Sequence, residues 1–137
     1  MEKQKYAAIV LAAGSGKRMN SQVHKQYLII QDRPVLYYSL KEFEDSAVDE
    51  IVLVVGKGEE EFCRREIVDK YGISKVKAIV EGGKERYHSV FEGLKQTSDA
   101  DYVLIHDGAR PFVNQDIIRR CMLEVPEYQA CVVGMPV

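Results

Sequence analysis

The sequence predicts a doubly wound α/β domain, with a mostly parallel sheet covered by helices on both faces. Apolar runs of strand length alternate with runs of helical periodicity along all 137 residues. The apolar runs are nearly uninterrupted, which is typical of strands buried on both faces of a parallel sheet. This alternation also predicts right-handed βαβ crossovers, and the length fits a single domain over residues 1–137.

The first part of the chain predicts two strands and two helices. Residues 6–12 are a continuous apolar run and indicate a buried strand. Pro34 opens a helix with apolar residues at helical spacing, because proline fits the first helical turn. Residues 51–55 are mostly β-branched and predict the second strand. Residues 59–71 then carry apolar residues four apart, and Gly72 is placed to end that helix.

The second part predicts three strands and two more helices. Short apolar runs indicate strands at residues 76–80, 102–105 and 130–133. The first of these helices carries its large apolar residues on one stripe: Tyr87, Val90, Phe91 and Leu94. The second helix includes Ile117, and Pro126 is expected to end it because proline disrupts a helix interior.

Composition excludes several classes of protein. The formal net charge of -2, from 19 cations against 21 acids, argues against a general binder of nucleic acid or of membrane surfaces. No apolar run is long enough to span a bilayer and no signal-peptide pattern is present, so we expect a cytoplasmic protein. Three widely spaced cysteines predict reduced core thiols rather than a zinc site: Cys63, Cys121 and Cys131.

A loop of small residues follows the first predicted strand and ends in two cations, Lys17 and Arg18. Residues with a small side chain or none let backbone N–H groups approach a phosphate chain: Ala12, Ala13, Gly14, Ser15 and Gly16. The spacing does not match a Walker A loop, and Met19 stands where a dinucleotide-binding loop needs a small residue. The loop therefore predicts a phosphate site of another kind.

Other strand ends carry residues that fit a nucleotide. Asp107 ends the fourth predicted strand, and a carboxylate beside a triphosphate implies a bridging Mg²⁺. Gly82 and Gly83 end the third strand, where their backbone suits a flat base that Ser89 can hydrogen-bond. Structural alternatives stay open, with Asp107 as a turn cap and Ser89 as a small residue facing the sheet.

Four segments together resemble the 2-C-methyl-D-erythritol 4-phosphate cytidylyltransferases of the non-mevalonate isoprenoid pathway. They are residues 11–19 (LAAGSGKRM), 25–27 (KQY), 82–90 (GGKERYHSV) and 106–111 (HDGARP). The resemblance runs from Tyr6 to Val137 and implies a Rossmann-like nucleotidyltransferase fold. It implies a Mg²⁺-dependent enzyme that transfers a cytidylyl group from CTP and releases pyrophosphate.

The resemblance also implies a role for individual residues. Arg18 and Lys25 would stabilise the transition state at the α-phosphorus, and Asp107 would bind Mg²⁺. Arg110 would hold the phosphate of the acceptor, and the remaining positions would contact CTP. These CTP contacts are Ala12, Ala13, Gly14, Ser15, Gly16, Lys17, Gly82, Gly83 and Ser89.

Two alternatives to methylerythritol phosphate transfer stay open. Ribitol 5-phosphate is the second candidate acceptor, and the third hypothesis is a CTP-binding module without activity. Family members continue past the segment that matches Val137, into a dimer-forming arm and further acceptor-site residues. We therefore expect this chain to be an N-terminal portion of an enzyme that is homodimeric at full length.

Overall fold

The computed structural model describes residues 5–12, 29–30, 33–83, 85–97, 99–107, 114–128 and 130–133. Its centre is a five-stranded sheet in the order β5-β4-β1-β6-β7, with every neighbouring pair parallel. The strands are β1 (Tyr6–Ala12), β4 (Glu50–Val55), β5 (Val76–Glu81), β6 (Tyr102–Asp107) and β7 (Ala130–Val133). Two short antiparallel strands, β2 (Ile29–Ile30) and β3 (Arg33–Pro34), were not expected from the sequence.

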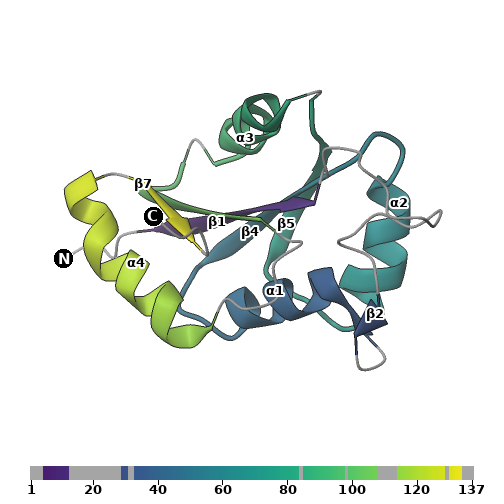
Figure 1. Ribbon diagram of the computed structural model, residues 1–137, viewed down its shortest axis with the longest axis horizontal. Coiled ribbons are helices and arrows are strands. Elements are labelled where there is room, and N and C mark those ends of the chain that lie inside the picture. The colour runs from purple at the N-terminus through teal and green to yellow at the C-terminus, as the bar shows by residue number, and fades with distance from the viewer. Residues whose placement is uncertain are drawn as a thin grey trace.

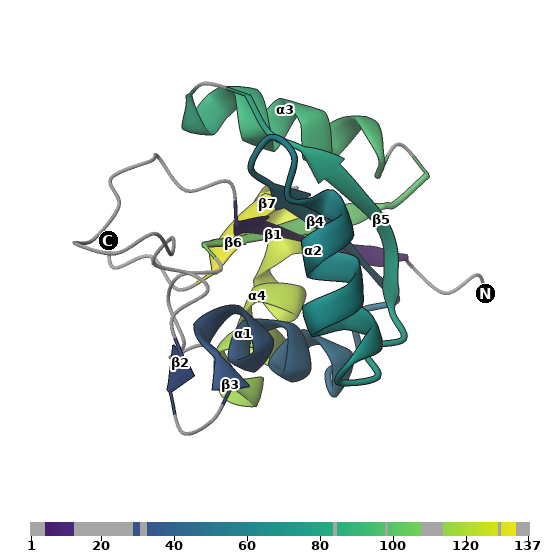
Figure 2. The same cartoon turned by 90° about the vertical axis from the view of Figure 1, so that its right-hand side faces the viewer.

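Helices cover both faces of this sheet, so the predicted doubly wound α/β fold is confirmed (Figure 1). One face carries α1 (Val35–Glu44), α2 (Glu60–Cys63) and α4 (Gln115–Tyr128). The α2 helix continues directly as the π-helical segment η2 (Arg64–Asp69), and Gly72 follows with a φ of 66°. The other face carries α3 (Arg86–Lys95), which lies on the opposite side of the sheet from the other helices in the side view as well (Figure 2).

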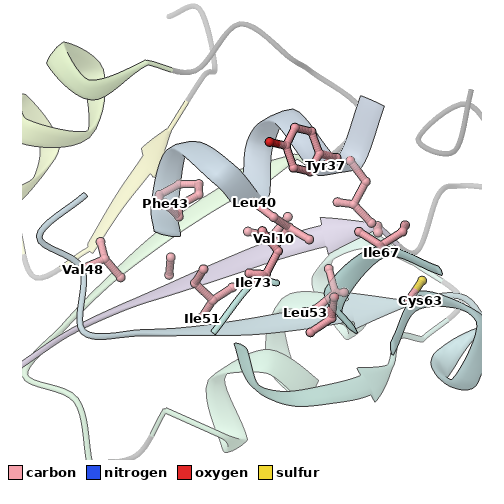
Figure 3. Packing of buried hydrophobic residues seen from close by; sticks show 14 of the residues in the cluster. Val10, Tyr37, Leu40, Phe43, Val48, Ile51, Leu53, Cys63, Ile67 and Ile73 are labelled. Atoms are coloured by element: carbon pink, nitrogen blue, oxygen red, sulfur yellow. The ribbon is translucent and has the colours of Figure 1, made fainter. Parts of the chain in front are cut away.

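The larger core lies between the sheet and the three-helix face. Alternate residues of β1 and β4 point into it, where they meet Phe43 of α1 and Ile67 of η2 (Figure 3). The smaller core lies under α3, where Gly93 packs on Ile9 and Val54. The strands β1 and β4 therefore bury both of their faces, as their uninterrupted apolar runs predict.

One crossover has the opposite hand from the other three. The connections through α1 and α2 both step toward β5 along one face, and the connection through α3 steps back along the other face. The connection through α4 steps away from β5, but α4 lies on the α1 face. The expectation of uniformly right-handed crossovers is therefore wrong for β6–α4–β7. The apolar stripe of α4, with Ile118 and Cys121, finds its contacts in the larger core.

Of the four residues on the apolar stripe of α3, Val90 packs against the smaller core, and the other three do not face the sheet. Tyr87, Phe91 and Leu94 are among the exposed large apolar residues of the structure. The sheet side of α3 carries small residues instead, because a helix that lies close on Ile9 and Val54 has no room for larger side chains. Helical periodicity indicates that one side of α3 is apolar, but it does not say which element covers that side.

Two local predictions about α4 are also corrected. The helix runs to Tyr128, so Pro126 does not end it. Cys63 is a buried free thiol as predicted, but Cys121 is disulfide-bonded, and the prediction of a reduced thiol there is wrong. The α4 helix packs against β7, which carries Cys131 in register with Leu104.

Candidate functional site

Three of the predicted site segments emerge from one edge of the sheet. The register pairs Ala12 with Val55 and Val55 with Glu81, so β1, β4 and β5 end in one row. Leu11 pairs with Asp107, so β6 ends beside the same row. Because all five strands are parallel, this row is the carboxyl edge, where doubly wound proteins bind ligands.

The order of the strands sets the spacing along this edge. The strand β6 is the direct neighbour of β1, which places Asp107 beside the strand that leads into the predicted phosphate loop. The strand β5 lies two strands away on the other side of β1, or about 10 Å at ordinary strand spacing. A nucleotide with its base near β5 and its phosphates over β1 spans this distance.

Eight of the predicted site residues lie outside the described residues, and their roles stay predictions. They are Ala13, Gly14, Ser15, Gly16, Lys17, Arg18, Lys25 and Arg110. The described members of the predicted site are Ala12, Gly82, Gly83, Ser89 and Asp107.

Asp107 is the last residue of β6 and is partly buried. Within the described ranges, no group of three or more histidine, cysteine, aspartate or glutamate residues is placed to hold a metal ion. A single carboxylate nevertheless fits Mg²⁺, which proteins usually bind through one or two carboxylates together with substrate phosphates and water.

The two glycines after β5 differ in what their backbone can offer a ligand. The N–H of Gly82 donates to the carbonyl of Val55 at 2.8 Å, so the sheet already uses this donor. Gly83 is exposed, and a Cβ at this position would lie 2.2 Å from the Cβ of His88. Gly83 is therefore required by the close approach of its loop to the first turn of α3.

The start of α3 is held by a cap that the sequence did not suggest. Glu85 is the N-cap residue, and its backbone N–H donates to Nδ1 of His88 at 3.3 Å while its side chain accepts from the backbone of His88. This reciprocal pattern has the form of a capping box with histidine in place of the usual glutamate or glutamine. The sequence does contain a pattern that could have indicated this cap. Glu85 and His88 are three residues apart at the start of a predicted helix.

Ser89 follows this cap and is 2% exposed. Ser89 and Gly93 are four residues apart and lie on the same side of α3, and Gly93 packs on Ile9 and Val54. The structure therefore places Ser89 as the small, sheet-facing residue of the alternative interpretation. Its hydrogen bond to a base stays a prediction.

The resemblance implies CTP as the ligand at this edge, and on that expectation Gly83→Ala weakens its binding by displacing the cap of α3. The added methyl group meets the Cβ of His88, a side-chain atom with no freedom to rotate away, so the loop or the helix start must shift. The affinity for CTP, measured by calorimetry, is expected to fall about tenfold. Gly72→Ala is the control, because its φ of 66° makes alanine strained in a turn at the other edge of the sheet. Equal CTP affinity in the Gly83 and Gly72 variants would contradict this expectation.

Two glutamates that the sequence did not single out meet at the same edge. A hydrogen bond with Glu81 raises the pKa of Glu60, the first residue of α2. The N–H of Gly58, which donates to Glu81 at 3.0 Å, lowers the pKa of Glu81. Glu60 therefore takes up a proton at a higher pH than Glu81. The sequence did not predict a contact between these two glutamates, because Glu60 lies in an acidic run that is typical of a solvated helix start.

Hollows lined by described residues lie at the amino end of the strands and along α3. One of about 370 Å³ lies at the amino end of the strands, between the start of β1, the α1–β4 connection and α4, and its lining includes Tyr6, Ala47 and Met122. Another of about 460 Å³ lies along the exposed stripe of α3. No helix in the described part of the chain is both long and apolar enough to cross a membrane.

The model of the 2-C-methyl-D-erythritol 4-phosphate cytidylyltransferase family matches residues 6–137. The chain belongs to this family. A family member from Lachnoclostridium phytofermentans is 54% identical over 132 residues, which are 96% of this chain and 57% of that protein. One from Alkaliphilus metalliredigens is 45% identical over 135 residues, or 97% of this chain and 56% of the relative.

A solved structure supports the same assignment. The crystal structure of 4-diphosphocytidyl-2C-methyl-D-erythritol synthase from Anaerococcus prevotii matches with a TM-score of 0.73 and 31% identity. The match covers 89% of this chain and 51% of that one. This cytidylyltransferase family member thus spans a little over half the length of the curated relatives that it matches.

Proposed function

We propose that this chain forms the CTP-binding part of an enzyme that transfers a cytidylyl group to 2-C-methyl-D-erythritol 4-phosphate. The observation that carries the proposal is the register, which brings Ala12, Asp107 and the end of β5 to one edge of the sheet. Membership of the family supports the choice of CTP and of this acceptor. Pyrophosphate is the second product.

The proposed reaction needs positive charge and positioning more than a general base. The attacking group is a phosphate monoester, which is already an anion at neutral pH because its second pKa is about 6. Two anions must therefore approach each other while charge builds up at the α-phosphorus. Arg18 and Lys25 are the residues that we assign to this charge, and a fixed cation is worth most where water is excluded.

Asp107 is the residue that we assign to Mg²⁺. Its carboxylate supplies hard oxygen ligands beside the phosphate loop that follows β1, which is the donor type that Mg²⁺ requires. Bound Mg²⁺ would supply charge neutralisation on the triphosphate.

Several parts of the proposal concern the whole enzyme rather than this chain. We assign the acceptor phosphate to Arg110, and we propose that the region beyond the matched part of the longer relatives completes the acceptor site and a homodimer. A cytoplasmic location agrees with the sequence pattern. Residues 1–137 would form one domain of that enzyme.

Two binding and turnover measurements test this function. We expect CTP with Mg²⁺ to bind this chain in calorimetry at least about tenfold more tightly than UTP, because the site is proposed to read cytosine. Pyrophosphate release is then measured with methylerythritol phosphate and with ribitol 5-phosphate. Turnover with ribitol phosphate alone would move the assignment to that acceptor. Absence of CTP binding would overturn the proposal, and binding without turnover would identify a module that needs the rest of the enzyme.

A further inference from the structure

A buried polar pair joins α1 to the end of β6. The hydroxyl of Ser39 and Nε2 of His106 share a hydrogen bond of 3.0 Å, across 67 positions of the sequence. Neither residue has any exposed surface. Phe43, one turn further along α1, packs on the same imidazole with ring centroids 5.7 Å apart. The imidazole of His106 is thus held by two side chains of one helix.

Apolar residues of the larger core lie beside this pair. Leu104, two residues earlier on the same face of β6, belongs to the larger hydrophobic core. Burial of a polar pair in such a place stabilises the fold less than burial of an aliphatic pair of similar volume would. The reason is that each polar group loses its hydration. A hydrogen bond, however, holds two groups at a set distance and angle, which apolar contact does not.

The pair joins α1 to β6, the strand that ends at Asp107. His106 directly precedes Asp107, and these two residues pair in register with Val10 and Leu11 of β1. The helix α1 begins at Val35, soon after the segment with Lys25 in the sequence. A contact between α1 and His106 therefore ties the strand that presents Asp107 to the helix that follows the predicted cationic segment.

We propose that Ser39 and His106 are positioning residues that hold Asp107 in place for a metal–nucleotide complex. The proposal rests on the proposed function, because Asp107 has this task only in a nucleotidyl transfer site. His106 lies on the α1 face of β6, and strand alternation places Asp107 on the opposite face. The pair therefore acts through the backbone of residues 106 and 107 and does not touch the reacting atoms.

The test compares variants that remove the hydrogen bond with one that retains it. Ser39→Ala removes the hydroxyl, His106→Leu removes the imidazole, and His106→Gln keeps an amide nitrogen able to reach the hydroxyl of Ser39. Thr97→Val is the matched control, because Thr97 is 4% exposed and its hydroxyl donates to the carbonyl of Leu94 at 3.1 Å, at the far end of α3. The readouts are the affinity for Mn²⁺ with CTP, followed by electron paramagnetic resonance, and the NMR shift of the Asp107 carboxyl carbon.

We expect Ser39→Ala and His106→Leu to lower the Mn²⁺ affinity about tenfold and to shift the Asp107 signal, since small displacements of a positioned group have large effects. His106→Gln is expected to stay within about threefold of the parent chain on the same reasoning. Thr97→Val is expected to lower the thermal midpoint in the same way as Ser39→Ala, without either effect at Asp107. This contrast separates a positioning role from a loss of stability alone.

Failure of the positioning role and failure of the proposed function give different results. If Ser39→Ala leaves both the Mn²⁺ affinity and the Asp107 signal unchanged, the positioning role is overturned while the proposed function stands. If the parent chain binds no Mn²⁺ with CTP, the proposed function fails in the parent itself. The NMR shift still decides whether the pair positions Asp107, because it needs no bound nucleotide.

Discussion

Asp107→Asn is expected to lower the affinity for Mn²⁺ in the presence of CTP by at least about 100-fold. The substitution keeps the size of the side chain but removes its negative charge and one of its two carboxylate oxygens. Asp107 lies at the end of β6, in register with Leu11 and so beside the start of the predicted phosphate loop. The measurement is a Mn²⁺ titration by electron paramagnetic resonance, with the unfolding midpoint recorded in parallel.

Asp116→Asn is the matched control for this experiment. Asp116 is an exposed carboxylate on α4 that pairs with Arg119, so its loss changes the net charge of the chain by the same amount. We expect this control to bind Mn²⁺ with CTP as the parent does. Equal losses in both variants would mean that net charge rather than Asp107 governs the binding.

The layer arrangement of the fold was predictable, because the apolar runs and their alternation with helices depend on local periodicity. The five strands lie where these runs predict, and β1 is central in the sheet. The hand of the β6–α4–β7 crossover was not predictable from the run lengths. It depends on which face of the sheet accepts the apolar stripe of α4, and that is a property of the whole core. The same reason explains why the exposed side of α3 was not predictable: the side of a helix that faces the sheet also depends on the whole core.

The sequence allowed a prediction of which strand ends form the candidate site. It did not allow a prediction of the contacts that hold those strand ends in place. Parallel strands bring their carboxyl ends together, so Ala12, Asp107 and the glycines after β5 share an edge. The sequence gave no sign that Gly83 is required by His88, or that Ser39 meets His106. The first depends on the close approach of a loop to α3 and the second on the packing of α1 against β6, and spacing in the sequence encodes neither.

Phe43→Ala is expected to lower the free energy of unfolding by about 3–5 kcal/mol, the usual cost of truncating a buried phenylalanine. Phe43 has no exposed surface and lies in the larger core between α1 and the sheet (Figure 3). This loss is a large share of the roughly 5–15 kcal/mol that stabilises an ordinary domain. Urea unfolding followed by circular dichroism measures the difference.

Phe62→Ala is the control for this loss, because Phe62 is 41% exposed on α2 and leaves a much smaller void. A loss from Phe43→Ala no larger than that from Phe62→Ala would contradict the packing described here. Phe43→Leu adds a second comparison, since it keeps most of the apolar volume and is expected to cost less than about 1.5 kcal/mol. It nevertheless removes the ring that packs on His106. If the ring itself steadies the imidazole, Phe43→Leu will weaken Mn²⁺ binding with CTP while the domain stays folded, which joins the stability of this core to the site at the edge of the sheet.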